Sequence, residues 1–322
     1  MADISVIVPS NHGHHELLKI MLAICQQTVK PSEIVIVDSS IECGTCPAEV
    51  INLCKVSSVH LIYLHQAKAL PGQARNIGLE LVGAELIAFI DVQTIPRPNW
   101  LEISSYLLIS KGVTGVWGAT FFKANTKFER LVRDCFYGIL PRRTLPGSVF
   151  QRKVFAQAGQ FVDWARAGED TEWMLRLELL NVPVVSPSSA LIDYTGLIGS
   201  DIKKLIKKWL RNYTASRDLP HFFPQRLFLW LIFYPLLILI AFNWNYLIAD
   251  WRMDSPFYIG HVTKIVVSMP VLAYVVIRGL ALPLQRGVSV GRLLPIRFFA
   301  ITFICFIADV VKVLAFSIPK RR

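Results

Sequence analysis

An uncharged apolar run of 22 residues, 227–248 (LFLWLIFYPLLILIAFNWNYLI), is the feature that most restricts how this chain can fold. A helix of that length crosses the roughly 30 Å hydrocarbon core of a bilayer. Its Trp and Tyr residues gather toward the end of the run, as at a membrane interface. Two further apolar segments, 262–282 and 298–318, follow, each with charges in it or near its ends. The sequence therefore predicts a C-terminal transmembrane anchor of two or three segments.

The charge divides the chain in the same way. Residues 1–199 carry 17 Lys+Arg against 18 Asp+Glu, a net of −1, and residues 200–322 carry 17 against 5, a net of +12; together these give +11. A cationic segment favours nucleic acid or an anionic membrane surface. Because the positive residues here are interleaved with apolar runs, we expect a membrane partner and no nucleic acid.

Segment 201–213 (DIKKLIKKWLRNY) has the pattern of an amphipathic helix. Its apolar residues share one helical face and its Lys and Arg residues occupy mainly the rest, which is typical of a helix lying in the membrane interface. A soluble surface helix is the alternative. We expect a catalytic domain over 1–200, an interfacial helix and linker over 201–226, and a membrane region over 227–322.

The orientation of the anchor follows from its flanking charges. The N-terminus, MADISVIVPS, lacks the cationic start and long apolar run of a signal peptide, so we expect a cytoplasmic catalytic domain in an integral protein of a bacterial inner membrane. Counting Lys and Arg places loop 283–297 inside and loop 249–261 outside. The basic tail 320–322 fits this scheme only if one segment is re-entrant or interfacial.

The six cysteines are irregularly placed and predict no disulfide framework, which fits the cytoplasm. Cys43 and Cys46 form a lone CxxC pair. Since no second pair completes a metal site, the sequence assigns these two residues no role.

Short β-branched runs and helical patterns alternate over residues 1–200. Strands are predicted at 4–8, 33–37, 59–64, 85–90, 115–122 and 147–151, and helices at 14–27, 72–82, 125–138 and 169–181. This order predicts a layered α/β domain with a mostly parallel sheet. Ligands of such sheets bind beyond the carboxyl ends of the strands.

Polar groups follow three of these strands and open one later helix. They are Pro9-Ser10-Asn11, Asp38-Ser39-Ser40, Asp91-Val92-Gln93 and Gly168-Glu169-Asp170-Thr171. Carboxylates at two strand ends indicate a polar ligand, although turns that contain Asp occur in many α/β proteins.

In their order and context, these stretches resemble the family-2 glycosyltransferases, which have the GT-A nucleotide-sugar fold. The resemblance covers about residues 3–215 and rests on ISVIVPSN, EIVIVDSS, LPGQARNIGLELVGAELIAFIDVQTIPRPNWL, GSVFQRKVFAQAGQF and RAGEDTEWMLRL. It implies an inverting enzyme that moves a sugar from a nucleoside-diphosphate sugar to an acceptor hydroxyl.

The resemblance also implies a donor site. Asp38 would accept a hydrogen bond from the nucleotide base, with Arg75 completing that pocket and Pro9 and Asp91 lining it. The alternatives are an Asx turn or helix cap for Asp38, a surface position for Arg75 and a turn-stabilising role for Asp91.

Asp170 is the predicted catalytic base, because inverting transfer needs a carboxylate that removes the proton of the acceptor hydroxyl. Glu169 and Trp164 are the predicted acceptor-binding residues. The alternative for the acidic pair is helix capping, which acidic residues at a helix N-terminus favour. Trp173 is as well suited to core packing as to stacking on a sugar.

The resemblance implies a site for Mg²⁺ or Mn²⁺ at the Asp-x-Asp position, and here the sequence departs from the family. Gln93 stands where the second Asp is usual, and 193–196 (DYTG) lacks the His that many members have. An amide oxygen binds a hard cation without charge and therefore more weakly. Asp91 and Gln93 are thus doubtful ligands, and the sequence leaves metal dependence open.

Processive members carry Gln-x-x-Arg-Trp on the interfacial helix, where this chain has Leu205-Ile206-Lys207-Lys208-Trp209, so we expect transfer of a single sugar. The anchor predicts a membrane-associated acceptor: a glycolipid, a polyprenyl-linked glycan or a cell-surface polysaccharide. Two alternatives stay open. One is a non-catalytic membrane scaffold that keeps the fold, and the other is a transferase with a polyprenyl-phosphate sugar as donor.

Overall fold

The computed structural model describes residues 3–11, 14–41, 44–198, 201–219, 225–249 and 251–317. Two features of the sequence, Cys43 and the basic tail 320–322, lie outside the described residues.

A nine-stranded sheet occupies the centre of the described part of the first 200 residues. Its order is β3-β2-β1-β4-β7-β6-β9-β5, with β8 paired to β6. The strands are β1 (Ile4–Ser10), β2 (Glu33–Asp38), β3 (His60–His65), β4 (Leu86–Phe89), β5 (Thr94–Pro96), β6 (Gly115–Phe122), β7 (Arg142–Gln151), β8 (Val184–Val185) and β9 (Ile192–Tyr194). All six predicted strands are among them.

The strands have mixed directions in the second half of the sheet. Strand β1 runs parallel to β2 and β4, and β2 parallel to β3. Strand β7 is antiparallel to both of its neighbours, β4 and β6, and β5 is antiparallel to β9. Strand β6 runs parallel to β8 and β9, so most of the pairings are parallel, as expected, and β7 and β5 are the antiparallel exceptions. Hydrophobic patterns reveal that a strand is buried, but they do not reveal the direction of its partner.

Helices cover both faces of this sheet. One core cluster joins the sheet to α1 (His14–Cys25), α2 (Ala48–Ser57) and α4 (Trp100–Lys111), and the other joins it to α3 (Pro71–Leu81), α6 (Lys153–Ala158) and α7 (Glu169–Leu179). Along β1, Val6 and Val8 face the first cluster and Ile7 faces the second. The result is the predicted layered α/β domain, with the carboxyl ends of β1, β2 and β4 at one edge of the sheet.

The C-terminal part is helical. Its elements are α8 (Ile202–Ser216), α9 (Gln225–Leu247), α10 (Val262–Val275), a π-helical turn η1 (Val276–Ala281), α11 (Leu282–Gln285), α12 (Val290–Leu293) and α13 (Arg297–Ser317). Within the described residues, Lys264–Gln285 and Arg297–Ser317 are long and apolar enough to cross a membrane. Helix α9 covers most of the first predicted segment, 227–248, and contains Pro235.

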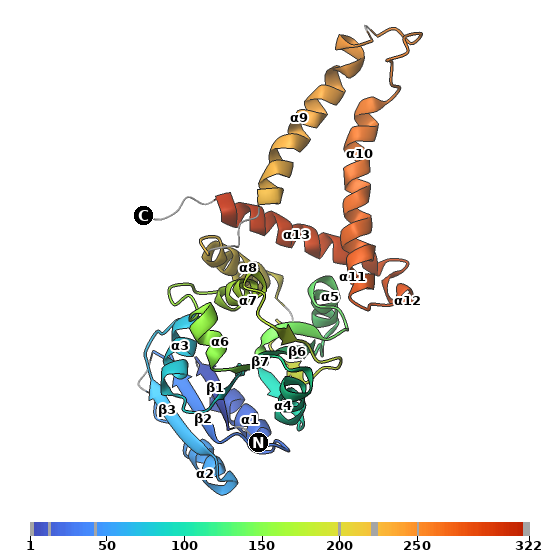
Figure 1. Ribbon diagram of the computed structural model, residues 1–322. Coiled ribbons are helices and arrows are strands. Elements are labelled where there is room, and N and C mark those ends of the chain that lie inside the picture. The colour runs from blue at the N-terminus through green and yellow to red at the C-terminus, as the bar shows by residue number, and fades with distance from the viewer. Residues whose placement is uncertain are drawn as a thin grey trace.

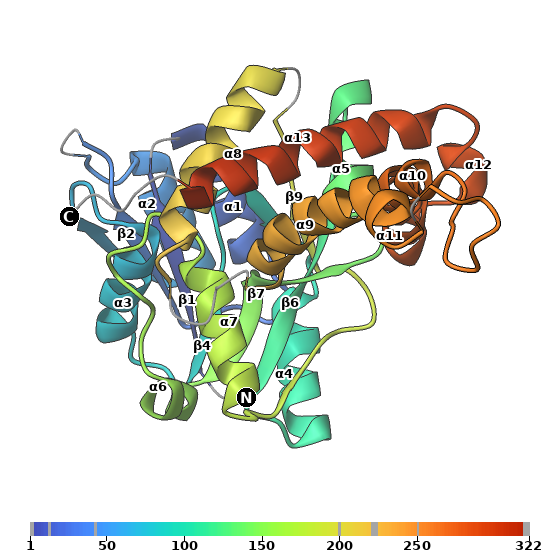
Figure 2. The same ribbon diagram turned by 90° about the horizontal axis from the view of Figure 1, so that it is seen from above.

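The three apolar segments have different orientations. Helices α9 and α10 form a hairpin that rises away from the α/β domain, whereas α13 lies across the top of that domain (Figure 1). Seen from above, α13 runs alongside α8 and over α5 (Lys127–Phe136) (Figure 2). Helix α13 therefore does not run beside α9 and α10, as a third membrane-spanning helix of the same bundle would.

The C-terminal helices are joined to the α/β domain by packing and by buried charge. Trp209 of α8 packs edge-to-face on Phe136 of α5, with ring centroids 5.3 Å apart. The carboxylate of Asp134, also in α5, is fully buried, and Arg292 and Arg297 each place a nitrogen 2.9 Å from its Oδ2. Because these arginines belong to α12 and α13, this cluster links the domain to the anchor directly.

Candidate active site

A cavity of about 560 Å³ opens at the carboxyl edge of the sheet. Strand β1 contributes Pro9 and Ser10, the turn after β4 contributes Asp91, and the start of α7 contributes Glu169 and Asp170. This edge is the topological switch point, since the chain leaves β1 toward β2 on one side and reaches β4 on the other. The cavity thus lies where a doubly wound sheet binds its ligands.

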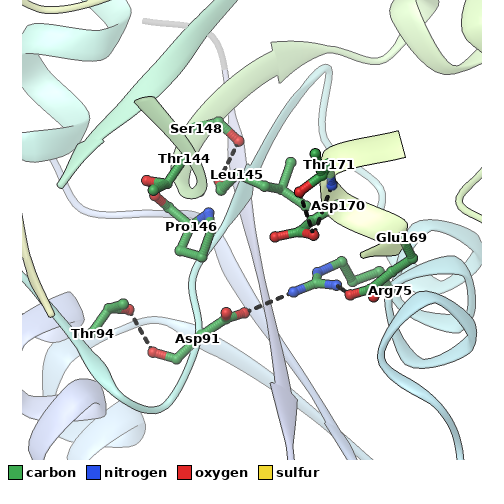
Figure 3. A network of polar contacts seen from close by, with 10 residues as sticks. All are labelled: Arg75, Asp91, Thr94, Thr144, Leu145, Pro146, Ser148, Glu169, Asp170 and Thr171. Carbon is green, nitrogen blue, oxygen red and sulfur yellow. Dashed lines mark hydrogen bonds and ion pairs between the residues drawn. The ribbon is translucent and has the colours of Figure 1, made fainter. Parts of the chain in front are cut away.

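Arg75 is the central charge of this cavity. Its Nη1 donates to Oε1 of Glu169 over 2.5 Å, and its Nη2 donates to Oδ1 of Asp91 over 3.0 Å. Figure 3 shows the guanidinium between the two carboxylates. Burial alone would lower the pKa of Arg75, but the charges of Asp91, Glu169 and Asp170 raise it above its usual value. Arg75 therefore stays charged and fixes the positions of both carboxylates.

Asp91 is also held by its own backbone turn. The hydroxyl of Thr94 donates to the Asp91 carbonyl over 2.5 Å, and the Thr94 N–H donates to the same oxygen over 2.9 Å. The side chain of Asp91 remains about one-third exposed and lines the cavity.

Asp170 lies in the first turn of α7, and its carboxylate is on the same side as Arg75 in Figure 3. Its Oδ1 accepts hydrogen bonds from the Thr171 N–H, at 2.7 Å, and from the Thr171 hydroxyl, at 3.3 Å. The preceding Gly168 has φ +90°, and a Cβ there would meet Leu219 Cδ1 at 2.8 Å and Ser216 Cβ at 3.0 Å. Only glycine suits this position, which packs the turn before Asp170 directly against the end of α8.

Asp38 is placed differently from the prediction. Its Oδ2 accepts hydrogen bonds from the Ser40 hydroxyl, at 2.7 Å, and from the Tyr63 hydroxyl, at 2.8 Å. The side chain is buried, and the cavity is lined by the neighbouring Ser39 rather than by Asp38. Arg75 contacts Asp91 and Glu169 instead of completing a pocket around Asp38. Arg75, Asp91 and Asp170 line one cavity, and Asp38 does not.

The two predicted acceptor residues also differ. Glu169 lines the cavity, and it is only 4% exposed and bonded to Arg75. Burial raises the pKa of Glu169 above its usual value, and Arg75 opposes that shift. Trp164 is exposed and lies outside the lining residues. Trp173 is fully buried and stacks on Phe155, which makes it a core residue.

Residues 5–162 match the profile of glycosyl transferase family 2. The N-terminal domain belongs to this family. The protein is therefore a glycosyltransferase, and the resemblance drawn from its motifs is confirmed.

One solved structure supports the assignment of the fold. The mannosyltransferase PcManGT from Pyrobaculum calidifontis, in complex with GDP-Man and Mn²⁺, superposes with a TM-score of 0.52 at 16% identity, over 97% of this chain and 89% of that one. S. aureus TarS 1-349 in complex with UDP-GlcNAc gives 0.48 at 14% identity, over 98% and 89%. No curated protein sequence matches this chain. The glycosyltransferase domain thus has the predicted GT-A fold.

The residues expected to hold a divalent metal do not fit that role well. Asp91 is bonded to Arg75, and Oε1 of Gln93 accepts a hydrogen bond from the Tyr194 hydroxyl over 3.0 Å. Gly196 leaves the room for this arrangement, since a Cβ there would lie 2.2 Å from Gln93 Oε1. Asp193, the nearest substitute for the missing His, is paired with Lys123 at 3.0 Å and with Arg97 at 3.4 Å.

Within the described residues, no group of three or more His, Cys, Asp or Glu side chains has the arrangement of a metal site. The glycosyltransferase offers one partly available carboxylate, Asp91, where a Mg²⁺ or Mn²⁺ site is usually built from several oxygens. We therefore derive no catalytic step through a metal.

Besides Arg75, three cations that line the cavity were not predicted from the sequence. Arg166 precedes the GED triplet, and Lys208 and Arg211 come from α8. The sequence analysis assigned α8 only to the membrane interface. A signal was nevertheless available, because 204, 207, 208 and 211 have the i, i+3, i+4, i+7 spacing of one helical face.

Proposed function

We propose that this glycosyltransferase transfers a single sugar, with inversion, from a nucleoside-diphosphate sugar to a hydroxyl of a membrane-associated acceptor. The observation that carries the proposal is the shared cavity of Asp91, Arg75 and Asp170 at the carboxyl edge of a GT-A sheet. The family match supports sugar transfer, and the position of Asp170 supports its role as base.

Asp170 meets the geometric needs of a general base. Thr171 makes both of its contacts to Oδ1, so Oδ2 would be left for the acceptor hydroxyl. The proton of that hydroxyl would pass to Asp170 while its oxygen bonds to the anomeric carbon. The bond from the anomeric carbon to the nucleoside diphosphate breaks in the same step, and the diphosphate leaves with the electron pair.

Arg75 would act by positioning rather than by contact with the sugar. Its two ion pairs fix Asp91 on one side of the cavity and Glu169, the neighbour of Asp170, on the other. A charge-assisted pair between such buried groups holds both side chains in one geometry. The donor and the base would thereby keep a constant relative position.

The arrangement of the anchor supports an acceptor at the membrane. Helix α8 forms one wall of the cavity, while its apolar residues Ile202 and Trp209 pack in the cluster formed with α13 and α5. If α9 and α10 span the bilayer and α13 lies in its interface, the basic tail returns to the cytoplasmic side, as its charge requires. This topology resolves the conflict that three full spans would create.

The test is Asp170→Asn in the full-length enzyme in purified membranes. We expect transfer to fall by about 10²–10⁴-fold, since the amide cannot accept the proton. Asp163→Asn is the matched control, because Asp163 is exposed on the preceding loop and outside the lining residues. Labelled nucleotide sugars and labelled polyprenyl-phosphate sugars, supplied separately, identify the donor class. Full activity of Asp170→Asn would refute the mechanism.

A further inference from the structure

A second, smaller cavity of about 340 Å³ is lined by four cations and one apolar side chain. The lining residues are Ile198, Lys204, Lys207, Lys208 and Arg211. The four cations form one stripe along α8, which we call the basic stripe. The apolar residues of the same helix point elsewhere, with Leu205 buried and Trp209 packed on Phe136. The basic stripe therefore faces a concavity rather than the core.

The charge of the basic stripe is uncompensated by the described residues. No carboxylate among them forms an ion pair with any of the four cations. Arg211 donates only to the amide oxygen of Asn212, at 3.3 Å. Like charges at i, i+4 destabilise a helix. Four cations on one face, around a cavity, form a site that an anion would stabilise.

The two cavities share a wall. Lys208 and Arg211 line the smaller cavity and also the larger one that contains Asp170. An anion in the smaller cavity would thus lie beside the reacting groups and on the side of the molecule that carries α13 and the α9–α10 hairpin. That is the side from which a membrane-bound acceptor would enter.

We propose that the basic stripe binds a phosphate or diphosphate group of the acceptor, so that the acceptor is a lipid whose phosphate lies between its apolar chain and the reacting hydroxyl. The assignment rests on the proposed function. It deepens that function, because it restricts the membrane-associated acceptor to the phosphate-bearing class. Planar bidentate contacts from Arg211 and point charges from the lysines suit such a group.

The experiment compares two synthetic acceptors with the same glycan, one linked to its lipid through a diphosphate and one through a neutral glycosidic bond. The full-length enzyme is reconstituted in nanodiscs of phosphatidylcholine, and steady-state kinetics are measured for the parent and for Lys207→Gln. Lys207 lines only the smaller cavity. The matched control is Lys203→Gln, which removes the same charge from an exposed position of α8 outside both cavities.

For Lys207→Gln we expect the KM of the diphosphate acceptor to rise about tenfold, the scale of one charge-assisted hydrogen bond. The KM of the donor and of the neutral acceptor should stay within twofold, as should every constant of Lys203→Gln. A rise in the donor KM would instead place the donor diphosphate in the cavity and overturn the proposal. Equal effects of Lys207→Gln and Lys203→Gln on the KM of the diphosphate acceptor would also overturn it, because the acceptor would then respond to the overall charge of α8 rather than to a site.

A binding measurement separates this proposal from the proposed function. It compares the affinity of Asp170→Asn for the diphosphate acceptor with that of the double variant Asp170→Asn, Lys207→Gln. Unchanged binding in the double variant refutes the basic stripe while Asp170-dependent transfer still stands. Weakened binding in the double variant, together with no transfer by the parent enzyme to any acceptor, refutes the proposed function alone.

Discussion

The buried carboxylate of Asp134 should decide whether the anchor and the glycosyltransferase domain unfold together. Its side chain has no exposed surface, and Arg133, Arg292 and Arg297 surround it. Asp134→Asn would leave three guanidinium groups around a neutral amide. Burial of charge without a partner is costly, and removal of one partner of a buried ion pair destabilises a protein by about 3–5 kcal/mol.

The assay is thermal unfolding of the full-length protein in one detergent, monitored by fluorescence. A loss of about 3–5 kcal/mol at roughly 2–4 °C per kcal/mol lowers the Tm by about 6–20 °C. Arg297→Gln should lower it by less than half as much, since Arg133 and Arg292 would still neutralise the carboxylate. The expected order of Tm is therefore parent, Arg297→Gln, Asp134→Asn.

Glu178→Gln provides the comparison with a surface ion pair. Glu178 pairs with Arg143, and both side chains are more than 40% exposed. Such a pair contributes about 1 kcal/mol at most, so the Tm should fall by about 4 °C or less. If Asp134→Asn lowers the Tm no further than Glu178→Gln does, the buried cluster does not join the anchor to the domain, and the reasoning is refuted.

Three other predictions follow from the site and the anchor. Asp91 is the one partly available carboxylate that the described residues place at the expected metal position, so EDTA should lower the activity by less than about tenfold. Gln93→Asp would add a second carboxylate there, and Mn²⁺ should then stimulate the variant but not the parent enzyme. Burial lowers the pKa of Lys208, so its positive charge is lost as the pH rises through that lowered value. The acceptor KM should therefore rise with pH in a lower range than the pKa of an ordinary lysine would give. Lys208→Arg should move this rise of the KM to higher pH, because arginine keeps its charge. If α13 does not span the membrane, cysteines introduced at Ile296 and Ser317 should react with an impermeant maleimide from the same side, and labelling from opposite sides would show a full span.

Much of the fold could be predicted, because buried strands and helices have recognisable local patterns of apolar residues. The β-branched runs located all six expected strands, and helical spacing located α1, α3, α5 and α7. The antiparallel β7 could not be predicted in this way. Its direction depends on how the connection through α5 returns to the sheet, which is a property of the whole chain.

The candidate site shows the same limit at the level of single residues. The sequence located Asp91 and Asp170, because strand ends and helix starts have recognisable neighbours. It did not reveal that Arg75 lies between Asp91 and Glu169, since the partners of a long side chain are separated by 16 and 94 residues. Asp38 ends its strand as predicted, but the hydroxyls of Tyr63 and Ser40 donate hydrogen bonds to its carboxylate.

Helix α8 is part of the candidate active site as well as the connection between the α/β domain and the C-terminal helices. Helix α8 supplies Lys208 and Arg211 to the cavity wall, and its end packs against Gly168, immediately before the acidic pair. The other side of α8 is fixed by α13, where Lys312 lies 5.9 Å from the ring of Tyr213 and Arg217 bonds to the Ala315 carbonyl over 3.4 Å. A shift of α13 relative to the domain would therefore move the cationic wall and the turn that carries Asp170 together. The position of Asp170, the proposed base, thus depends on the contacts between α8 and α13, so α8 connects the proposed acceptor site to the proposed base.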